Sequence, residues 1–414
     1  MYITKRFLYL LIAVFMAVNL YSDEPVSLPV LSKDTGKITD TYIGKSSNPI
    51  VIIIQDMHCN GPIQRSISEI LRQLKTQIKE KLYVVGVEGN EGVINTSILR
   101  NLPSDKLKET LTQSLVDKGL ITGVELYDIE NPNNIIIIGV EDKEIYNKNL
   151  AQLKDMLFQN DKWKRDFLFL TSRIKADKKR FYSDTLWHLD KLHTKYEKNK
   201  ISLYAYLDKL RAAADKRGGA PTDIYPNLKQ VISANENIKI DQLRLVEEIE
   251  DYFYHVKLAA CENEHQKEIV FIDRFTMLVE SYFENAVSSI SSENVEGNMD
   301  TFIRAVNKRY RLEIKDLREK LKNAQEFYIT ARKRNEILVK NLLKQIKERK
   351  QAVDNNSLGV ILIGGFHTQG IEDVLRSKGC SYITIMPIVK GAPGYTKDLY
   401  FERLKNEEGL GGSE

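Results

Sequence analysis

Short, continuous runs of apolar residues rich in β-branched side chains recur near both ends of the chain. They cover residues 49–54, 82–87 and 135–140 in the first third of the sequence, and 358–363 and 382–386 near its end. Runs of this length are typical of strands that are buried on both faces of a sheet. We therefore predict a mostly parallel sheet built from both ends of the chain.

Helical spacing of apolar residues separates these predicted strands. Between the first two runs, apolar residues recur every three or four positions from Ile63 to Leu74, and Pro62 suits the first turn of a helix. A second helix is predicted over residues 370–378, between the last two runs. Strands that alternate with helices of this size are typical of βαβ units, in which helices cover a parallel sheet.

The pattern changes between residues 143 and 350, where Lys, Glu, Leu and Tyr dominate and Pro and Gly almost vanish apart from a break at 216–226. Three- and four-residue steps alternate along a nearly strict heptad formed by Ile314, Leu317, Leu321, Ala324, Tyr328 and Ala331. Such a heptad is the seam of a coiled coil or helical bundle. We predict a long helical insertion whose seam packs within the chain.

Together these patterns predict an α/β protein with a mostly parallel sheet core, flanking helices and a long helical insertion. The predicted divisions are a signal peptide at 1–22, a leader at 23–48, the first part of the α/β core at 49–142, the helical insertion at 143–350, the second part of the core at 351–400 and a tail at 401–414.

The N-terminus has the layout of a secretory signal. Lys5 and Arg6 precede an apolar run over residues 7–20, and Ser22 offers a small residue for cleavage. The run is shorter than the roughly 20 residues that a membrane-spanning helix needs. We therefore predict a protein exported to the periplasm or secreted, with no stable membrane span after cleavage; an uncleaved N-terminal anchor is the alternative.

Charge and cysteine content narrow the function classes. Removal of residues 1–22 lowers the net charge from +4 to +2, so nothing in the overall charge indicates binding to nucleic acid. Cys59, Cys261 and Cys380 are an odd number of thiols, which leaves at least one free and excludes a disulfide scaffold. The sequence leaves open whether any two of them pair.

Three predicted strands run into residues that can carry chemistry. His58 follows the first strand, Glu88 follows the second, and His367 follows the late strand after Gly364 and Gly365. In open parallel sheets, ligands bind beyond the carboxyl ends of the strands, where neighbouring loops converge. We therefore predict that His58, Glu88 and His367 form one site, although about 310 residues separate the two histidines.

Activation of water is the chemistry that suits two imidazoles and a carboxylate. These residues could hold a divalent transition metal that lowers the pKa of bound water. Without metal, Glu88 could act as the general base while a histidine positions the nucleophile or donates a proton. The residues alone leave both mechanisms open.

Other polar residues near the strand ends are weaker candidates for the same site. Asp56 precedes His58, and Glu141 and Asp142 end the third strand, while Gly364 permits a tight turn and a close approach to a ligand. Cys59 lies beside His58, but adjacent residues at a strand end point apart, which argues against a Cys–His pair. The remaining histidines fall in the helical region and are predicted to be structural or solvated: His188, His193, His255 and His265.

With these residues in view, the sequence resembles the superfamily that groups erythromycin esterases, the haem-binding ChaN-like proteins and the TraB/Tiki proteins. Gly364-Gly365-Phe366-His367 resembles its late Gly-x-x-His motif, and Val87-Glu88-Gly89 resembles its middle motif. The block 334–337 also resembles the C-terminal part of TraB-type members. The first motif differs, because Gln55 stands where the family has glycine, although His58 is kept.

The resemblance covers residues 49–142 and 330–390 and implies a site formed by His58, Glu88 and His367, with Arg334 as a neighbour. Members of the superfamily include hydrolases, metal-dependent proteases and haem or iron binders. The resemblance therefore implies a class of site rather than one activity.

Three hypotheses follow for the function. The first is an exported hydrolase that cleaves an ester or amide in a small-molecule or peptide substrate, with water activated by Glu88 or by a metal on His58, Glu88 and His367. The second is a haem- or iron-binding protein of the exported compartment. The third is a non-catalytic interaction protein whose heptad at 314–331 binds a partner. We favour the hydrolase.

Overall fold

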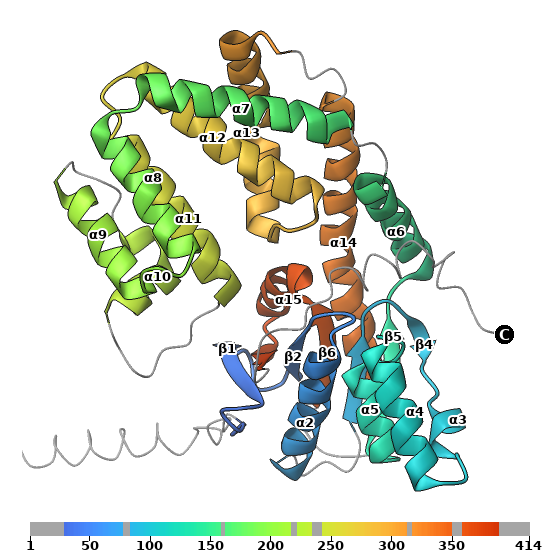
Figure 1. Cartoon of the computed structure of the whole chain (residues 1–414). Helices are drawn as coiled ribbons and strands as arrows, with labels where there is room; N and C mark the ends of the chain where they lie inside the picture. The colour runs from blue at the N-terminus through green and yellow to red at the C-terminus, as the bar shows by residue number, and fades with distance from the viewer. Residues whose placement is uncertain are drawn as a thin grey trace, which may run out of the picture.

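The computed structural model describes residues 29–77, 83–158, 162–216, 222–233, 242–312, 317–349 and 358–388. The signal peptide predicted at 1–22 and the tail predicted at 401–414 lie outside the described residues. Figure 1 shows an α/β core at one end of the molecule and a group of helices at the other.

A seven-stranded, mostly parallel sheet forms the centre of the core, in the order β1-β7-β2-β6-β3-β5-β4. Its strands are β1 (Gly36–Tyr42), β2 (Ile50–Asp56), β3 (Tyr83–Val87), β4 (Glu91–Val93), β5 (Ile135–Val140), β6 (Leu358–Gly364) and β7 (Ser381–Pro387). The antiparallel strands β1 and β4 form the two edges. This arrangement confirms the predicted fold class.

The order of the strands explains how the two ends of the chain meet. The late strand β6 lies between β2 and β3 and pairs with both in parallel. In this register Asp56 lies beside Gly364, and Val87 lies beside Leu362. The ends of three neighbouring strands therefore meet at one point of the sheet, which is where parallel sheets bind ligands.

Helices cover both faces of the sheet, so its central strands are buried on each side. Ile52 and Ile54 of β2 pack against the helices on one face of the sheet, and Val51 and Ile53 pack against the helices on the other face. The first layer consists of α2 (Gly61–Gln77) and α5 (Gly123–Glu130), and the second of α15 (Gly365–Ser377) and the C-terminal half of α14 (Leu317–Arg349). The helices α3 (Ser97–Arg100) and α4 (Asp105–Asp117) pack against α2 and α5. The alternation along β2 is the period of two that a strand requires.

Strand β1 falls in the segment predicted to be a leader. Its residues, Gly36–Tyr42, pair with β7 along the sheet edge, and only Gly36 and Thr39 among them are buried. The sequence Gly-Lys-Ile-Thr-Asp-Thr-Tyr has few apolar residues, so it lacks the continuous run that marks the central strands. The described part of the leader therefore belongs to the core.

The region between β5 and β6 is helical, as predicted. Its helices are α6 (Lys143–Phe158), α7 (Lys162–Phe181), α8 (Asp184–Glu197), α9 (Leu203–Asp215), the short 3₁₀ helix η2 (Thr222–Ile224), α10 (Pro226–Ile232), α11 (Gln242–Ala259), α12 (Glu264–Phe283), α13 (Ser289–Tyr310) and α14. They pack around two apolar clusters, one formed mainly by α6, α7, α12, α13 and α14, and one formed mainly by α8 to α11.

Helix α14 joins the insertion to the core. Its N-terminal half carries the heptad, and Leu317, Leu321, Ala324 and Tyr328 are buried in the first cluster of the insertion. Its C-terminal half packs Leu342 and its neighbours onto the sheet. The described part of the heptad is thus covered within the chain, whereas Ile314 lies outside the described residues.

Cys59, Cys261 and Cys380 are all described, and no disulfide joins any two of them. Among the described helices, none combines the length and apolar character needed to cross a bilayer.

Candidate active site

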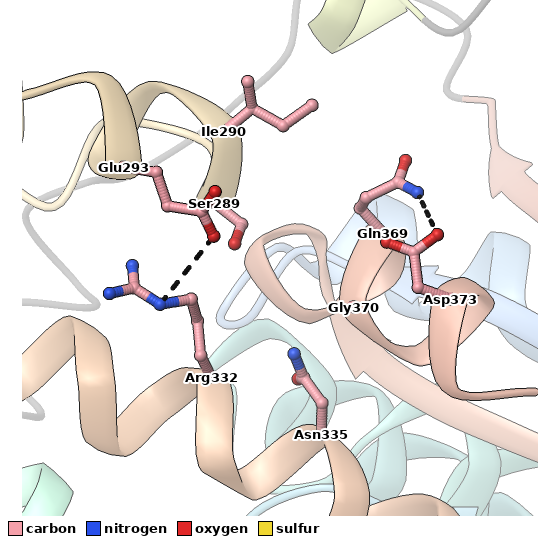
Figure 2. A pocket seen from close by; sticks show the side chains of 8 residues that line it. All are labelled: Ser289, Ile290, Glu293, Arg332, Asn335, Gln369, Gly370 and Asp373. Carbon is pink, nitrogen blue, oxygen red and sulfur yellow. Dashed lines mark hydrogen bonds and ion pairs between the residues drawn. The ribbon is translucent and has the colours of Figure 1, made fainter. Parts of the chain in front are cut away.

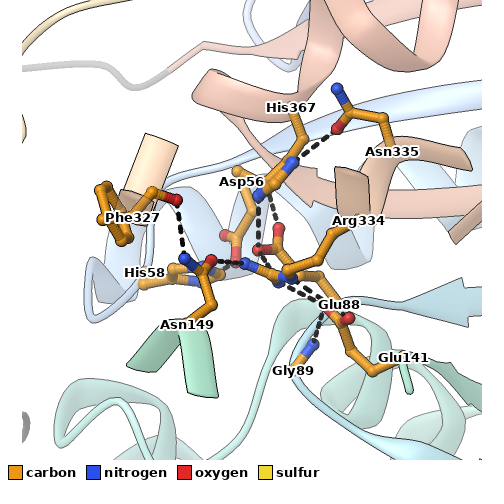
Figure 3. A network of polar contacts seen from close by, with 11 residues as sticks. Asp56, His58, Glu88, Gly89, Glu141, Asn149, Phe327, Arg334, Asn335 and His367 are labelled. Atoms are coloured by element: carbon orange, nitrogen blue, oxygen red, sulfur yellow. Dashed lines mark hydrogen bonds and ion pairs between the residues drawn. The ribbon is translucent and has the colours of Figure 1, made fainter. Parts of the chain in front are cut away.

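The structure brings the three predicted residues together at the carboxyl ends of β2, β3 and β6. His58 follows β2 in a turn, Glu88 follows β3 directly, and His367 lies in the first turn of α15, which begins where β6 ends. Figure 3 shows His367 and Arg334 pointing toward Glu88, with His58 and Asp56 close by. A single network of polar contacts connects the site.

Glu88 is the centre of this network, and only 11% of its side chain is exposed. One carboxylate oxygen, Oε1, accepts a hydrogen bond of 2.8 Å from Arg334 Nη2 and lies 3.4 Å from His367 Nε2. The other, Oε2, accepts a hydrogen bond of 2.8 Å from the backbone N–H of Gly364. These donors hold both oxygens of Glu88 in place.

Arg334 connects the ends of β3 and β5 to the helical insertion. Its guanidinium forms an ion pair with Glu141 through Nη2 and donates through Nε to the same carboxylate at 3.2 Å. It also donates through Nη1 to Asn149 Oδ1 at 2.9 Å and lies 5.1 Å above the ring of Tyr146. Arg334 is therefore saturated with partners and anchors Glu88 rather than facing solvent.

His367 is buried, with about 5% of its side chain exposed. Its Nδ1 lies 2.7 Å from Asn335 Oδ1, so that nitrogen carries the hydrogen and donates to the amide oxygen. In this tautomer of the neutral ring, Nε2 presents a lone pair toward Glu88. Burial lowers the pKa of His367 to about 4, against the opposing attraction of Glu88.

His58 has the opposite environment, because 44% of its side chain is exposed. Its Nδ1 lies 2.5 Å from Asp56 Oδ2, and Asp56 is itself buried and accepts a second hydrogen bond of 2.5 Å from Gln64 Nε2. Gln64 is fixed in turn by the backbone N–H of Gly123, which donates to its Oε1 at 2.7 Å. Gln64 and Gly123 thus hold Asp56, and through it the His58 ring, in one orientation, while the ring edge of His58 remains open to solvent.

The charges of the site set the protonation of each group. Protein groups around the His58 ring remove part of its hydration, which disfavours the charged form, but Asp56 and Glu88 outweigh that effect and raise its pKa to about 9. Burial would likewise raise the pKa of Glu88, but His367, Arg334 and His58 lower it to about 2. Near pH 7 the site therefore holds a carboxylate at Glu88, a neutral His367 and a protonated His58.

Gly364 marks the space between Glu88 and His58. A methyl group added at its Cα would lie 3.5 Å from Glu88 Oε2 and 3.8 Å from His58 Nε2, with no closer contact from other residues. The second ring nitrogen of His58 therefore faces the same small space as Glu88. This space also adjoins the first turn of α15, whose N-cap residue is a glycine without a side-chain cap.

The residues of the site do not suit a metal held by His58, Glu88 and His367. Both oxygens of Glu88 already accept hydrogen bonds, and the guanidinium of Arg334 places a permanent positive charge where a cation would approach that carboxylate. Within the described residues, no group of three or more His, Cys, Asp or Glu side chains is arranged to hold a metal ion.

The other predicted residues divide between the site and its surroundings. Asp56, Glu141, Arg334 and Gly364 all belong to the network described above. Asp142 does not: its Oδ1 accepts a hydrogen bond of 3.0 Å from the backbone N–H of Ile145 and caps the start of α6. It therefore supports the fold at the third strand end rather than the site.

Residues that were predicted to lie outside the site do so. Cys59 adopts a positive φ of 58° and its side chain lies against Gly119. His193 is buried against Phe253 in the insertion, and His265 stacks on Phe181. His188 and His255 accept or donate hydrogen bonds within their own helices or to a neighbouring tyrosine.

Three amides of the network were not predicted as site residues: Gln64, Asn149 and Asn335. Asn335 alone had a signal in the sequence, since it follows Arg334 in the block that resembles TraB-type proteins. Asn149 and Gln64 lie on helices in unremarkable polar positions, and only tertiary packing brings them to the strand ends.

An open cleft of about 320 Å³ lies on the far side of Asn335, between α13, α14 and α15. Figure 2 shows the side chains that line it, which are mostly polar. Asn335 lines this cleft and also binds His367, so the amide separates the cleft from the buried histidine.

Comparison with known proteins adds no identification: no family model matches the chain, and no match is found among curated proteins or solved structures. The resemblance to the erythromycin esterase, ChaN-like and TraB/Tiki superfamily stays a prediction from the motifs.

Proposed function

We propose that the protein is a hydrolase in which the pair of His58 and Asp56 transfers a proton from water during cleavage of an ester or amide. The observation that carries this proposal is the contact of 2.5 Å between His58 Nδ1 and the buried Asp56, beside an exposed ring edge. A buried carboxylate that holds Nδ1 leaves Nε2 as the nitrogen that exchanges protons with a substrate or water.

In this mechanism the neutral form of His58 accepts a proton from water at Nε2 as the water oxygen attacks the carbonyl carbon. Asp56 stabilises the imidazolium that forms and keeps the ring in the correct orientation. The first turn of α15 begins at this space and has no side-chain cap, so we assign its backbone N–H groups as donors to the developing oxyanion. The proton then passes from His58 to the leaving group.

Glu88 has a different role from the one that its position in the sequence suggests. Its oxygens are held by Arg334 and Gly364, and its low pKa makes it a weak base. We assign to Glu88 the positioning of Gly364 and the N-terminus of α15. Its negative charge also stabilises the protonated form of His58. The exposed His58 is a better candidate for the base than the buried Glu88.

Export supports the choice of substrate class, because the predicted signal at 1–22 would place the enzyme where small molecules and peptides arrive from outside the cell. Haem or iron binding stays an alternative prediction. No observation among the described residues of the site favours it, because Tyr146, which lies next to the network, is covered by the guanidinium of Arg334.

The test is turnover of a panel of esters and amides by the wild type and by His58→Gln, both with and without chelator. General acid–base groups contribute about 10² to 10⁴ in rate, so His58→Gln should lose at least a hundredfold while keeping its fold. His265→Gln is the matched control, because His265 is exposed in the insertion and stacks only on Phe181. A His58→Gln enzyme with wild-type turnover would remove this proposal.

The pH dependence tests the same role. A base with a pKa of about 9 is active when unprotonated, so turnover should rise with pH through the neutral range and level off near pH 9. Asp56→Asn removes the main group that raises this pKa. The pH at which turnover stops rising should therefore be lower in this variant, and its maximal turnover should fall. A rate that is independent of pH between 6 and about 9 would contradict the assignment.

A further inference from the structure

Helix α7 has one face buried in the insertion and one face turned outward. Its buried face consists of Trp163, Phe167, Leu170 and Ile174, which pack into the first apolar cluster of the insertion. In Figure 1 this helix lies across the end of the molecule opposite the sheet. Its outward face is therefore remote from the candidate active site.

Basic side chains dominate the outward face of α7. The exposed ones are Lys164, Arg165, Arg173, Lys175, Lys179 and Arg180. The two acidic residues of the helix, Asp166 and Asp177, are only partly exposed, and Asp177 pairs with Arg309. The whole chain is nearly balanced, with 61 basic and 57 acidic residues, so this one-signed face is a local concentration of charge.

Five of the six positive charges of this face are also available to a partner. Within the described part of the chain, Arg165, Arg173, Lys175, Lys179 and Arg180 form no ion pair with an acidic side chain, whereas Lys178 on the border pairs with Asp190 and Asp273. Exposed cations without a carboxylate beside them keep their full attraction for an anionic surface.

Two large apolar side chains stand among these cations. Leu168 is 70% exposed and Phe169 is 49% exposed, and the guanidinium of Arg173 lies 6.0 Å above the ring of Phe169. Leu168 and Phe169 point outward although the same helix buries four other large apolar residues nearby. Basic side chains around exposed Leu and Phe are the composition of helices that lie in the interface of a membrane.

We propose that the outward face of α7 binds the surface of an anionic lipid bilayer, with Leu168 and Phe169 inserted between the headgroups. The cations supply the attraction to anionic lipid, and the two apolar side chains supply a contact that a charged polymer cannot. This is why a bilayer fits the face better than a nucleic acid or an acidic protein. The surface is independent of the hydrolase proposal, because it shares no residue with that site.

The experiment is sedimentation of the full chain with vesicles. One set consists of equal parts of phosphatidylglycerol and phosphatidylcholine, and the other consists of phosphatidylcholine alone. We expect binding to the anionic vesicles only, and at least a tenfold loss when salt rises from about 0.05 M to about 0.5 M. All variants carry the same N-terminus, so binding to neutral vesicles measures any contribution from the apolar run at 7–20.

Two variants of α7 separate the two components of binding. Arg165→Glu/Lys175→Glu should lower the bound fraction about tenfold or more, because it reverses charge at the centre of the face. Leu168→Ala/Phe169→Ala keeps every charge and should lower binding about fivefold, since it removes the inserted side chains. Both changes are on an exposed face, so an unchanged thermal melt is expected.

Matched controls lie on α3 and α4, at the other end of the molecule in Figure 1. Lys106→Glu/Lys118→Glu makes the same change in net charge at exposed positions, and Ile98→Ala/Leu107→Ala removes two exposed apolar side chains. Both should bind like the wild type. The proposal is overturned if the controls lose as much binding as the α7 variants, or if the wild type binds heparin but not anionic vesicles.

Discussion

Two buried charge networks occupy the two halves of the molecule, and their differences separate a site from a structural support. One lies at the strand ends of the core, around Glu88, Arg334 and Glu141. The other lies in the insertion, where Lys257 is buried beside Asp190 at 2.6 Å, and Lys178 lies 2.6 Å from Asp273. Both join segments that are distant in the sequence.

The network of the insertion is balanced and closed. Two lysines face two aspartates, each lysine reaches both carboxylates, and the partners belong to α7, α8, α11 and α12. Such a group fixes how helices pack but has no spare proton or open edge. Buried charge alone is therefore no sign of catalysis.

The network of the core is unbalanced and open. Asp56, Glu88 and Glu141 outnumber the single permanent cation Arg334, and the proton on His58 supplies part of the missing positive charge. Because His58 is also the exposed member, the group whose proton reduces the excess negative charge is the one that solvent and substrate can reach. That combination distinguishes the candidate active site from the network in the insertion.

The largest expected effect comes from removing one cation from each network. Arg334→Met and Lys257→Met each leave buried carboxylates unpaired, and each should lower the free energy of unfolding by about 3–5 kcal/mol in urea titrations. Their effects on turnover should differ. Lys257→Met should keep wild-type turnover per folded molecule, whereas Arg334→Met should lose it because Glu88 and α15 are no longer held. Equal turnover in the two variants would contradict the assignment of the core network, rather than the insertion network, to the active site.

A smaller effect should appear in the stability of the core between pH 6.5 and pH 4. His367 has a folded pKa of about 4, below its ordinary value of 6.5, so the folded state binds fewer protons than the unfolded state in this window. The contribution of His367 to the free energy of unfolding is therefore present above pH 6.5. About 2–3 kcal/mol of this contribution is lost as the pH falls toward 4.

His367→Leu should remove that part of the pH dependence, although the variant is less stable at every pH because Asn335 loses its partner. The measurement is the free energy of unfolding at a series of pH values, with His265→Leu as the exposed control. If the free energy of unfolding of His367→Leu depends on pH between 6.5 and 4 as strongly as that of the wild type, the buried histidine is not the source of this dependence.

The smallest effect on stability should come from Gly364→Ala. The backbone of Gly364 has an ordinary φ of −63°, and the added methyl would meet Glu88 and His58 only at van der Waals distance. We expect a change of about 0.5 kcal/mol or less in unfolding, but about a tenfold loss of turnover, since the methyl occupies the space where water must lie. Gly297→Ala, in open space on α13, is the control. Unchanged turnover in Gly364→Ala would place the reacting water elsewhere.

The sequence predicted the core better than its edges. The central strands are continuous β-branched runs, so their positions follow from local pattern, and the strand-end rule brought His58, Glu88 and His367 together. Strand β1 is too polar to show such a run. Helix α15 begins at Gly365 rather than at 370, because two glycines at a strand end indicate a turn and conceal the start of a helix.

The supporting residues of the site were less accessible to prediction. Asn149 meets Arg334 across 185 positions of the chain, and no spacing rule connects them. The division of roles between His58 and Glu88 could not be predicted either, because it depends on which of the two is buried. Sequence pattern identifies strand ends, whereas burial and hydrogen-bond partners come only from packing.

The position of β6 in the sheet has a consequence for synthesis of the chain. Strand β2 pairs only with β6 and β7, so it has no neighbour in the sheet until the last part of the chain leaves the ribosome. Until then β3, β4 and β5 can pair among themselves. Glu88, however, lacks the hydrogen bond from the N–H of Gly364, and the space between Glu88 and His58 has not formed. The candidate active site is therefore completed last, so a nascent chain that ends before β6 has neither a closed sheet nor the means to act on a substrate.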